Sequence, residues 1–278
     1  MITFDQTYDV LGLQSKKDLF DYLTMVDGVK HIDIEHTYKI ALASIRYYNG
    51  DHAMREHLQA GQELERQWYE SLEQGKPDYS VYDNEFYVAD LWACWIVYSR
   101  KYLKAMENSK NMRQGVSISA QLRNAECVVD LGNGFGYTSA ALKQMFPWAK
   151  VYGTNLEDTF QYQVSSLVGK QYNFQVVPSS TMVPQNADLV FASEYFEHIE
   201  RPVEHLNDVI QEIEPKAFII ANAFGAISIG HFHLYYHGQK TIPGDKISRL
   251  FNQCLRDHGY KKIETKLWNN RPSYWRRP

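Results

Sequence analysis

The segment that decides the fold is a short apolar run followed by glycines at alternate positions: Cys127-Val128-Val129-Asp130-Leu131-Gly132-Asn133-Gly134-Phe135-Gly136-Tyr137-Thr138. The β-forming residues 127–131 indicate a buried strand, and residues 139–146 have a helix-like pattern. Glycine lets the chain turn sharply between strand and helix and lets a ligand approach the backbone closely. The segment therefore predicts the first half of a nucleotide-binding βαβ unit, with free N–H groups where the helix begins.

The glycine spacing separates several classes of ligand. A phosphate-binding P-loop ends in Gly-Lys-Ser/Thr, which this segment lacks. The dinucleotide fingerprint needs a third glycine at position 137, where this chain has Tyr137. The pattern present is Asp-x-Gly-x-Gly-x-Gly, from Asp130 to Gly136, and it resembles the first motif of class I S-adenosylmethionine (SAM)-dependent methyltransferases. The alternative, a glycine-rich turn without a ligand, is disfavoured by the elements that follow it.

Strand and helix patterns alternate beyond the glycines. Further strands are expected at 150–155, 174–177, 187–194 and 215–223. With a helix at 203–213 between the last two, this alternation predicts a parallel, doubly wound α/β sheet. A helix at 246–258 and an extended segment at 260–268 match the antiparallel hairpin that completes the sheet in the resembled family. The expected fold is thus a Rossmann-like, seven-stranded sheet, preceded by a helical extension.

The 278 residues suffice for one large domain or two modest ones. Residues 1–112 are expected to form a helical N-terminal region, and residues 113–278 the SAM-dependent methyltransferase domain. The N-terminal helices could form a cap over the site or the surface of a homodimer. Alternatively, they only cover one edge of the core.

The composition, with 44% hydrophobic and 22% charged residues, is that of an ordinary globular protein. A net charge of −4 argues against binding nucleic acid through overall charge alone, but leaves room for a local basic groove. Cys94, Cys127 and Cys254 lie far apart, which predicts buried, reduced thiols in a cytoplasmic protein. The start has no signal-peptide pattern, and no run of about 20 apolar residues would span a membrane.

The resemblance implies a set of SAM-binding residues: Asp130, Gly132, Asn133, Gly134, Gly136 and Glu194. In the family, a carboxylate after the second strand accepts hydrogen bonds from both ribose hydroxyls. Here that place holds Asn155, with Glu157 just beyond, and either residue could bind the ribose. Ser179 stands where relatives carry an adenine-binding Asp, although a plain turn is the alternative. Arg100 could pair with the methionine carboxylate or lie on a solvated helix face.

The residues after the fourth strand carry the candidate chemistry. Glu194-x-x-Glu197-His198 resembles small-RNA 2′-O-methyltransferases, which add a later histidine and hold a divalent ion at the ribose hydroxyls. His231 or His233 would be that histidine, and carboxylates with imidazoles suit Mg²⁺ or Mn²⁺ only moderately and a transition metal better. The same pattern also occurs in ubiquinone-type small-molecule O-methyltransferases, so no metal ligand is assigned. The candidate catalytic residues are His198, Glu197 and His231, with a histidine as general base or as a structural hydrogen-bonding group.

Missing motifs narrow the acceptor. The Asn/Asp-Pro-Pro-aromatic sequence that holds an exocyclic base amine is replaced by Ala192-Ser193-Glu194-Tyr195, and no cysteine follows a proline, as cytosine C5 methylation requires. We therefore expect SAM-dependent methyl transfer to oxygen or nitrogen of a small or nucleotide-like acceptor, with S-adenosylhomocysteine as product. The alternatives are a divalent-metal-assisted 2′-O-methyltransferase acting on RNA, and a non-catalytic SAM-binding protein. The basic, aromatic tail 269–278 could stack on bases, or lie tied down on the protein's own surface.

Overall fold

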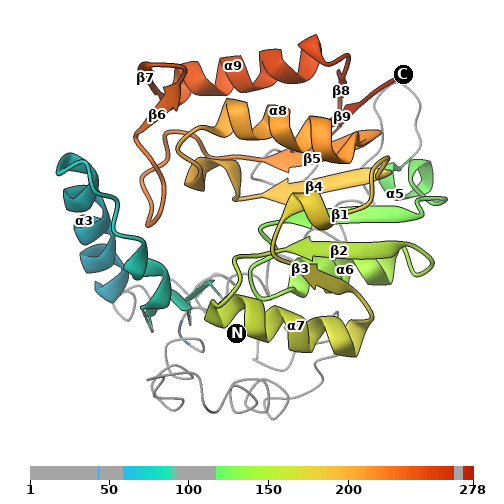
Figure 1. The fold of residues 1–278 in the computed structure, drawn as a ribbon, viewed down its shortest axis with the longest axis horizontal. Helices are drawn as coiled ribbons and strands as arrows, with labels where there is room; N and C mark the ends of the chain where they lie inside the picture. The colour runs from blue at the N-terminus through green and yellow to red at the C-terminus, as the bar shows by residue number, and fades with distance from the viewer. Residues whose placement is uncertain (1–42, 44–58, 85, 89, 92–116, 266–271) are drawn as a thin grey trace.

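The computed structural model describes residues 43, 59–84, 86–88, 90–91, 117–265 and 272–278. Its centre is a seven-stranded sheet in the order β3-β2-β1-β4-β5-β9-β8 (Figure 1). The strands are β1 (Cys127–Leu131), β2 (Lys150–Thr154), β3 (Gln175–Val177), β4 (Leu189–Ser193), β5 (Ala217–Ala221), β8 (Lys261–Ile263) and β9 (Ser273–Arg276). Strands β1 to β5 are parallel, and β9 is antiparallel to both β5 and β8. The expected doubly wound sheet with its closing hairpin is confirmed.

Helices cover both faces of the sheet because the strands alternate two sets of apolar residues. One set, which includes Val128, packs with α5 (Ile118–Gln121), α6 (Tyr137–Met145) and α7 (Phe160–Tyr172). The other set, which includes Val129, packs with α8 (Pro202–Ile213) and α9 (Gly244–Asp257). Both valines are fully buried, as a central strand between two helical layers requires. None of the helices in the described ranges has the length and apolar character that a bilayer span requires.

A two-stranded hairpin, β6 (Leu234–His237) and β7 (Lys240–Pro243), lies outside the main sheet (Figure 1). This hairpin is an addition to the expected fold. Its signal was present, because Gly238 begins a two-residue turn and has a φ of 58°, which glycine adopts without strain. The hairpin is held to η5 (Phe196–His198) through buried Tyr235, whose hydroxyl donates to the carbonyl oxygen of Glu197 at 3.3 Å.

The C-terminal tail is part of the sheet. Within β9, Tyr274 and Trp275 are fully buried, one on each face of the sheet. Stacking of these two rings on nucleic-acid bases, as considered from the sequence, is therefore wrong. The expectation that the cysteines are buried is only partly met, since Cys127 and Cys254 are half-buried free thiols and Cys94 lies outside the described residues.

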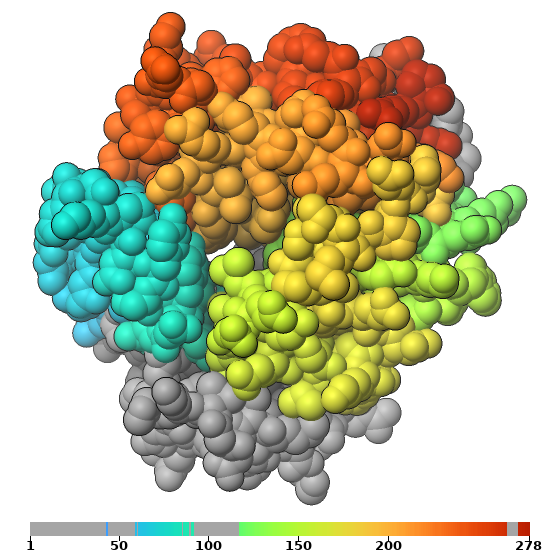
Figure 2. Space-filling model, in the orientation of Figure 1, coloured from blue at the N-terminus to red at the C-terminus, as the bar shows by residue number. Residues whose placement is uncertain are grey.

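The described part of the N-terminal region consists of α3 (Gln59–Glu73), η3 (Tyr79–Asp83) and residues 86–88 and 90–91. The parallel strands all end on the side of the molecule where α3 and η3 lie (Figure 1). The space-filling view shows a hollow where the cyan, lime and gold segments meet (Figure 2). The other N-terminal helices expected from the sequence, and the boundary at 112/113, fall outside the described residues.

Candidate functional site

The glycine turn, residues 131–137, joins β1 to α6 at the carboxyl end of the sheet. Gly132, Gly134 and Gly136 have φ values of 62°, 52° and 86°, in the left-handed region that other residues rarely adopt. At Gly132 a Cβ atom would also lie 2.3 Å from the ring of Tyr195. The turn thus needs glycine both for its backbone shape and for the approach of Tyr195. The first turn of α6 directs backbone N–H groups toward the same edge.

A chain of hydrogen bonds fixes the glycine turn to β1 and β2. The Ser139 hydroxyl donates to Asp130 Oδ2 at 2.7 Å, and Asn133 Nδ2 donates to Ser139 Oγ at 3.2 Å. Asn155 Nδ2, from just beyond β2, donates to Asn133 Oδ1 at 3.2 Å and to the Gly134 carbonyl at 2.6 Å. The structure therefore brings four of the predicted cofactor residues into one network.

Asn155 links the glycine turn to the end of β2 in this network. Its amide oxygen accepts the Leu156 N–H at 2.9 Å, so both ends of the side chain are engaged within the protein. Glu157, the alternative ribose ligand, is exposed in the loop after β2. Ser179 caps the short helix η4 (Ser180–Met182), with its hydroxyl accepting the Thr181 N–H at 3.2 Å, which is the plain turn role. Arg100 lies outside the described residues.

Asp130 is the buried charge of the turn, with 2% of its surface exposed. Burial raises the pKa of its carboxyl to about 7, and the hydrogen bond from Ser139 opposes this rise. A buried carboxylate with one hydroxyl donor is poorly compensated. The site is thus suited to a ligand that brings positive charge or N–H donors to this carboxyl.

Four residues form what we call the acid–histidine cluster: Glu194, Glu197 and His198, which follow β4, and His231, which lies in the loop between β5 and β6. Glu194 has a φ of 52°, a strained conformation for a residue other than glycine, and such outliers gather at functional sites. Glu197, in η5, is fully buried. Its Oε1 accepts the Ala223 N–H at 2.8 Å, and its Oε2 has no hydrogen-bond partner within the described structure. Burial, and then the nearby Glu194 carboxylate, raise the pKa of Glu197 well above its usual range.

The two histidines of the cluster pack edge to face, with ring centroids 4.7 Å apart. His231 is buried, and its Nδ1 lies 3.2 Å from the Ala226 carbonyl oxygen, which can only accept a hydrogen bond. The Nε2 of neutral His231 therefore carries the lone pair. Burial, and then the nearby His231, lower the pKa of His198 to about 3, and burial also lowers the pKa of His231. Both rings are therefore neutral at neutral pH.

Three members of the cluster meet the geometric requirement for binding one ion. Glu194, Glu197 and His231 each offer a ligand atom, and these atoms lie within 4.8 Å of one another. The sequence proposed either His231 or His233 as the later histidine, and the structure places His231 with the carboxylates. His233 is exposed, and its ring lies beside that of Tyr69, with centroids 5.9 Å apart.

Two residues of the N-terminal region, which are not among the predicted site residues, contact the cluster. Trp68 Nε1 donates to the His231 carbonyl at 2.6 Å, and the Tyr82 hydroxyl lies 3.0 Å from His198 Nδ1. Tyr82 lies in an aromatic part of the sequence, with Tyr79, Phe86 and Tyr87 nearby, whereas no local pattern marks Trp68 as a site residue. Trp68 is fully buried among Tyr82, Phe232 and Tyr79, whose ring centroids lie 5.4 to 6.3 Å from its own.

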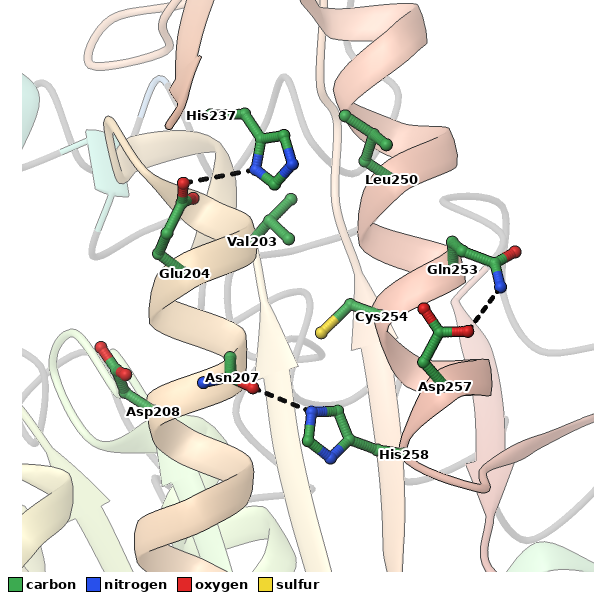
Figure 3. Close-up of a pocket in the computed structure, with 10 residues that line it drawn as sticks. All are labelled: Val203, Glu204, Asn207, Asp208, His237, Leu250, Gln253, Cys254, Asp257 and His258. Carbon is green, nitrogen blue, oxygen red and sulfur yellow. Dashed lines mark hydrogen bonds and ion pairs between the residues drawn. The ribbon is translucent and has the colours of Figure 1, made fainter. Parts of the chain in front are cut away.

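A groove of about 480 Å³ lies elsewhere, between α8 and α9 (Figure 3). Its polar lining includes the pairs Glu204–His237 and Asn207–His258, with contacts of 3.3 and 2.9 Å. None of the residues that line it belongs to the glycine turn or to the acid–histidine cluster. The groove is therefore separate from the candidate site.

Comparison with known proteins gives one sequence family. Residues 129–221 match the family model described as a methyltransferase domain. The matched stretch runs from β1 to β5, and includes the glycine turn with Glu194, Glu197 and His198 but not His231. No curated protein matches the chain.

Solved structures are similar to this chain at low sequence identity, and one with a TM-score above 0.5 shares its fold. N,N-8-amino-8-demethyl-D-riboflavin dimethyltransferase from Streptomyces davawensis matches with a TM-score of 0.51 and 10% identity, over 75% of this chain and 64% of that one. Mitomycin 7-O-methyltransferase matches with a TM-score of 0.49 and 11% identity, over 70% of this chain and 57% of that one. A third match is the O-methyltransferase of a polyketide synthase multienzyme from Brevibacillus brevis, in complex with S-adenosyl-L-homocysteine. Its TM-score is 0.42 and its sequence identity 16%, over 63% of this chain and 57% of that one. The match thus covers about three fifths of the length of these structures.

Proposed function

The chain carries a class I SAM-dependent methyltransferase domain, and from this premise we propose that it methylates an oxygen or nitrogen atom of a small or medium-sized acceptor. The observation that carries the proposal is the position of Glu194, Glu197 and His198, which follow β4 directly and so lie at the edge of the sheet where β1 also ends. Open α/β sheets bind their ligands at this edge. A hydroxyl group is the acceptor that the cluster fits best, because a hydroxyl must lose a proton during methyl transfer.

The residues around the glycine turn fit SAM. The buried Asp130 carboxyl would face the cationic methionine end, and the glycines leave space for close approach to the backbone. When bound, SAM supplies an activated methyl group on a sulfonium. The protein's own task is then to align an acceptor lone pair with that methyl group and to exclude water. Asn155 supports this task by holding the turn to β2.

Glu197 is the residue that we assign to proton removal. Its Oε2 is buried without a hydrogen-bond partner in the described structure, so it is available to accept the hydroxyl hydrogen of an acceptor. Its raised pKa makes the ionised carboxylate a stronger base than an ordinary glutamate. His198, with its low pKa, is a weaker base and is better suited to accepting a hydrogen bond that orients the acceptor.

The test combines SAM binding with turnover. Isothermal titration should show that SAM binds the wild type and the Glu197→Gln variant with similar affinity. Methyl transfer from methyl-labelled SAM to components of a cell extract should fall about 100-fold or more in Glu197→Gln, as expected for loss of a general base. Glu200→Gln, three residues further along the same loop, is the matched control and should keep its activity. If SAM binds and no labelled product forms with any variant or with the wild type, the chain is a non-catalytic SAM-binding protein.

A second candidate, a divalent-metal-assisted 2′-O-methyltransferase acting on RNA, is favoured by the clustering of Glu194, Glu197 and His231 within 4.8 Å. Glu197 Oε2 has no hydrogen-bond donor in the described structure, and Nε2 of neutral His231 carries a lone pair, so both atoms could bind an ion. Mixed carboxylate and imidazole ligands suit Mn²⁺ or Co²⁺. A bound ion would supply Lewis-acid activation of the acceptor hydroxyl.

Metal binding can be measured without any acceptor. Titration of Co²⁺ into the wild type should give a visible absorption spectrum that is lost in Glu194→Gln and retained in Glu200→Gln. An RNA oligonucleotide with a free 3′-terminal 2′-hydroxyl should be methylated, and one with that hydroxyl blocked should not. Turnover that is insensitive to chelators would remove the metal-assisted candidate and leave the small-acceptor function standing.

The N-terminal region is proposed to act as a cap over the acceptor side. The support is that α3 and η3 contact the loop before β6 through Trp68 and the loop after β4 through Tyr82. A homodimer surface on the same region is the alternative, and light scattering of the full chain distinguishes a dimer from a monomer.

A further inference from the structure

Three groups from distant parts of the chain converge at the edge of the acid–histidine cluster. The Tyr82 hydroxyl from η3 lies 3.0 Å from His198 Nδ1 and 3.4 Å from the carbonyl oxygen of Gly230. A Cβ atom at Gly230 would lie 2.2 Å from the Tyr82 hydroxyl oxygen and 2.7 Å from His198 Nδ1. Gly230 itself is buried with a φ of 81°. The convergence therefore depends on glycine at this position.

The protons of these three groups can be assigned by counting donors. The Tyr82 hydroxyl has one proton, and the Gly230 carbonyl can only accept. If Tyr82 donates to Gly230, then Nδ1 of His198 must carry a proton, which it can donate to the Tyr82 oxygen or to the Gly230 carbonyl that also bonds its ring, and all three groups are satisfied. If Tyr82 instead donates to His198, the buried Gly230 carbonyl loses this donor, which is costly for a buried polar group.

We propose that Tyr82 is a positioning residue that holds His198 in the Nδ1–H tautomer, so that its Nε2 presents a lone pair to the acceptor. The use of that lone pair rests on the proposed function, whereas the tautomer itself does not. His231 provides a parallel, because its Nδ1 donates to the Ala226 carbonyl and leaves its own Nε2 as an acceptor. The N-terminal region would thus complete the catalytic centre, and two neighbouring imidazoles would present the same kind of nitrogen.

The surroundings of Tyr82 hold its ring in place. Tyr79 stacks on it with centroids 6.3 Å apart and an angle of 17°, and Tyr87 meets it edge to face at 5.2 Å. Burial also raises the pKa of the Tyr82 hydroxyl, so it keeps its proton and remains a donor. A fixed ring and a permanent donor are what a residue that sets the tautomer of a neighbour requires.

The test uses histidine-selective ¹⁵N labelling of the full chain, with long-range ¹H–¹⁵N correlation to tell protonated from unprotonated ring nitrogens. A His198→Gln variant assigns the His198 signals. In the wild type, Nδ1 of His198 should be protonated and Nε2 should not. In Tyr82→Phe, the His198 pattern should shift toward the Nε2–H tautomer, whereas His231 should keep its pattern. Tyr79→Phe, from the same turn, is the matched control and should leave both histidines unchanged.

Two results would overturn the proposal: a proton on Nε2 of His198 in the wild type, or an unchanged His198 tautomer in folded Tyr82→Phe. The wild-type spectrum decides by itself if the variant does not fold. SAM titration on the same samples tests the proposed function separately from the tautomer. If the wild type does not bind SAM, the proposed function is refuted, but the assignment of the His198 tautomer is not affected.

Discussion

Replacing Asp130 by Asn should stabilise the SAM-free protein above pH 7 while weakening its binding of SAM. In the folded protein the carboxyl is buried, and its pKa is raised to about 7, chiefly by burial. Asparagine has nearly the same shape and can still accept the hydrogen bond from Ser139, but it carries no charge to bury. The variant therefore removes the cost of ionising residue 130 and also the charge that a cationic ligand would meet.

The sign and size follow from proton linkage. Below pH 3.8, the ordinary pKa, both the folded and the unfolded state are protonated, and the group has no effect on stability. Between pH 3.8 and about 7 the unfolded state releases its proton while the folded state keeps it, so stability falls as pH rises. Above about pH 7 Asp130 is ionised in both states, and the full free-energy cost of burying its charge lowers the stability of the folded protein. About 3 pH units at 1.36 kcal/mol each correspond to roughly 4 kcal/mol as an upper bound.

The assay is urea unfolding of wild type and Asp130→Asn without SAM, at intervals from pH 5 to pH 9. The difference in free energy of unfolding between the two proteins isolates residue 130, because all other groups titrate in both. This difference should grow with pH in favour of the variant and level off above about pH 7 to 8. A difference that stays constant over the range, or that favours the wild type more strongly at high pH, would refute the reasoning.

Three further outcomes are expected. Asp188→Asn should destabilise the protein by about 1–3 kcal/mol at pH 7 and less at pH 3, because the Asp188 carboxylate accepts the Glu126 and Cys127 N–H groups, bonds Lys216 and has a lowered pKa; urea unfolding at the two pH values measures this. Trp68→Phe keeps an aromatic ring but removes the 2.6 Å hydrogen bond to the His231 carbonyl, and should lower the free energy of unfolding by about 1–3 kcal/mol. If the variant is as stable as the wild type, that hydrogen bond does not contribute to stability. Trp275→Ala should cost about 3–5 kcal/mol in the same measurement if the tail belongs to the core, and almost nothing if its ring is free.

Features that depend on neighbouring residues were predictable from the sequence. The glycine turn could be recognised because the strand, the alternate glycines and the helix are contiguous in the sequence. Only glycine readily adopts positive φ values at three of five successive residues. The parallel sheet followed from the alternation of strands and helices. The hairpin β6–β7 was equally local, and its Gly238 turn was a readable signal that the sequence analysis passed over.

Features that depend on distant contacts were not predictable. The bonds from Tyr82 to His198 and from Trp68 to His231 join residues 116 and 163 positions apart, and no local pattern encodes which side chains will meet. The role of Asn155 could not be predicted without knowing how its side chain is oriented. Both ends of its amide form hydrogen bonds within the protein and are not open to a ligand. The choice between His231 and His233 likewise depended on which way the loop before β6 turns.

The place of β9 in the sheet has a consequence for the order of assembly. Within the described residues, β8 pairs with β9 alone, and β9 lies between β8 and β5 although it comes later in the chain. The edge strand can therefore join only as half of a hairpin, after the parallel strands have formed the template on which that hairpin docks. Amide hydrogens of β8 should consequently exchange with solvent earlier than those of the central strands β1 and β4.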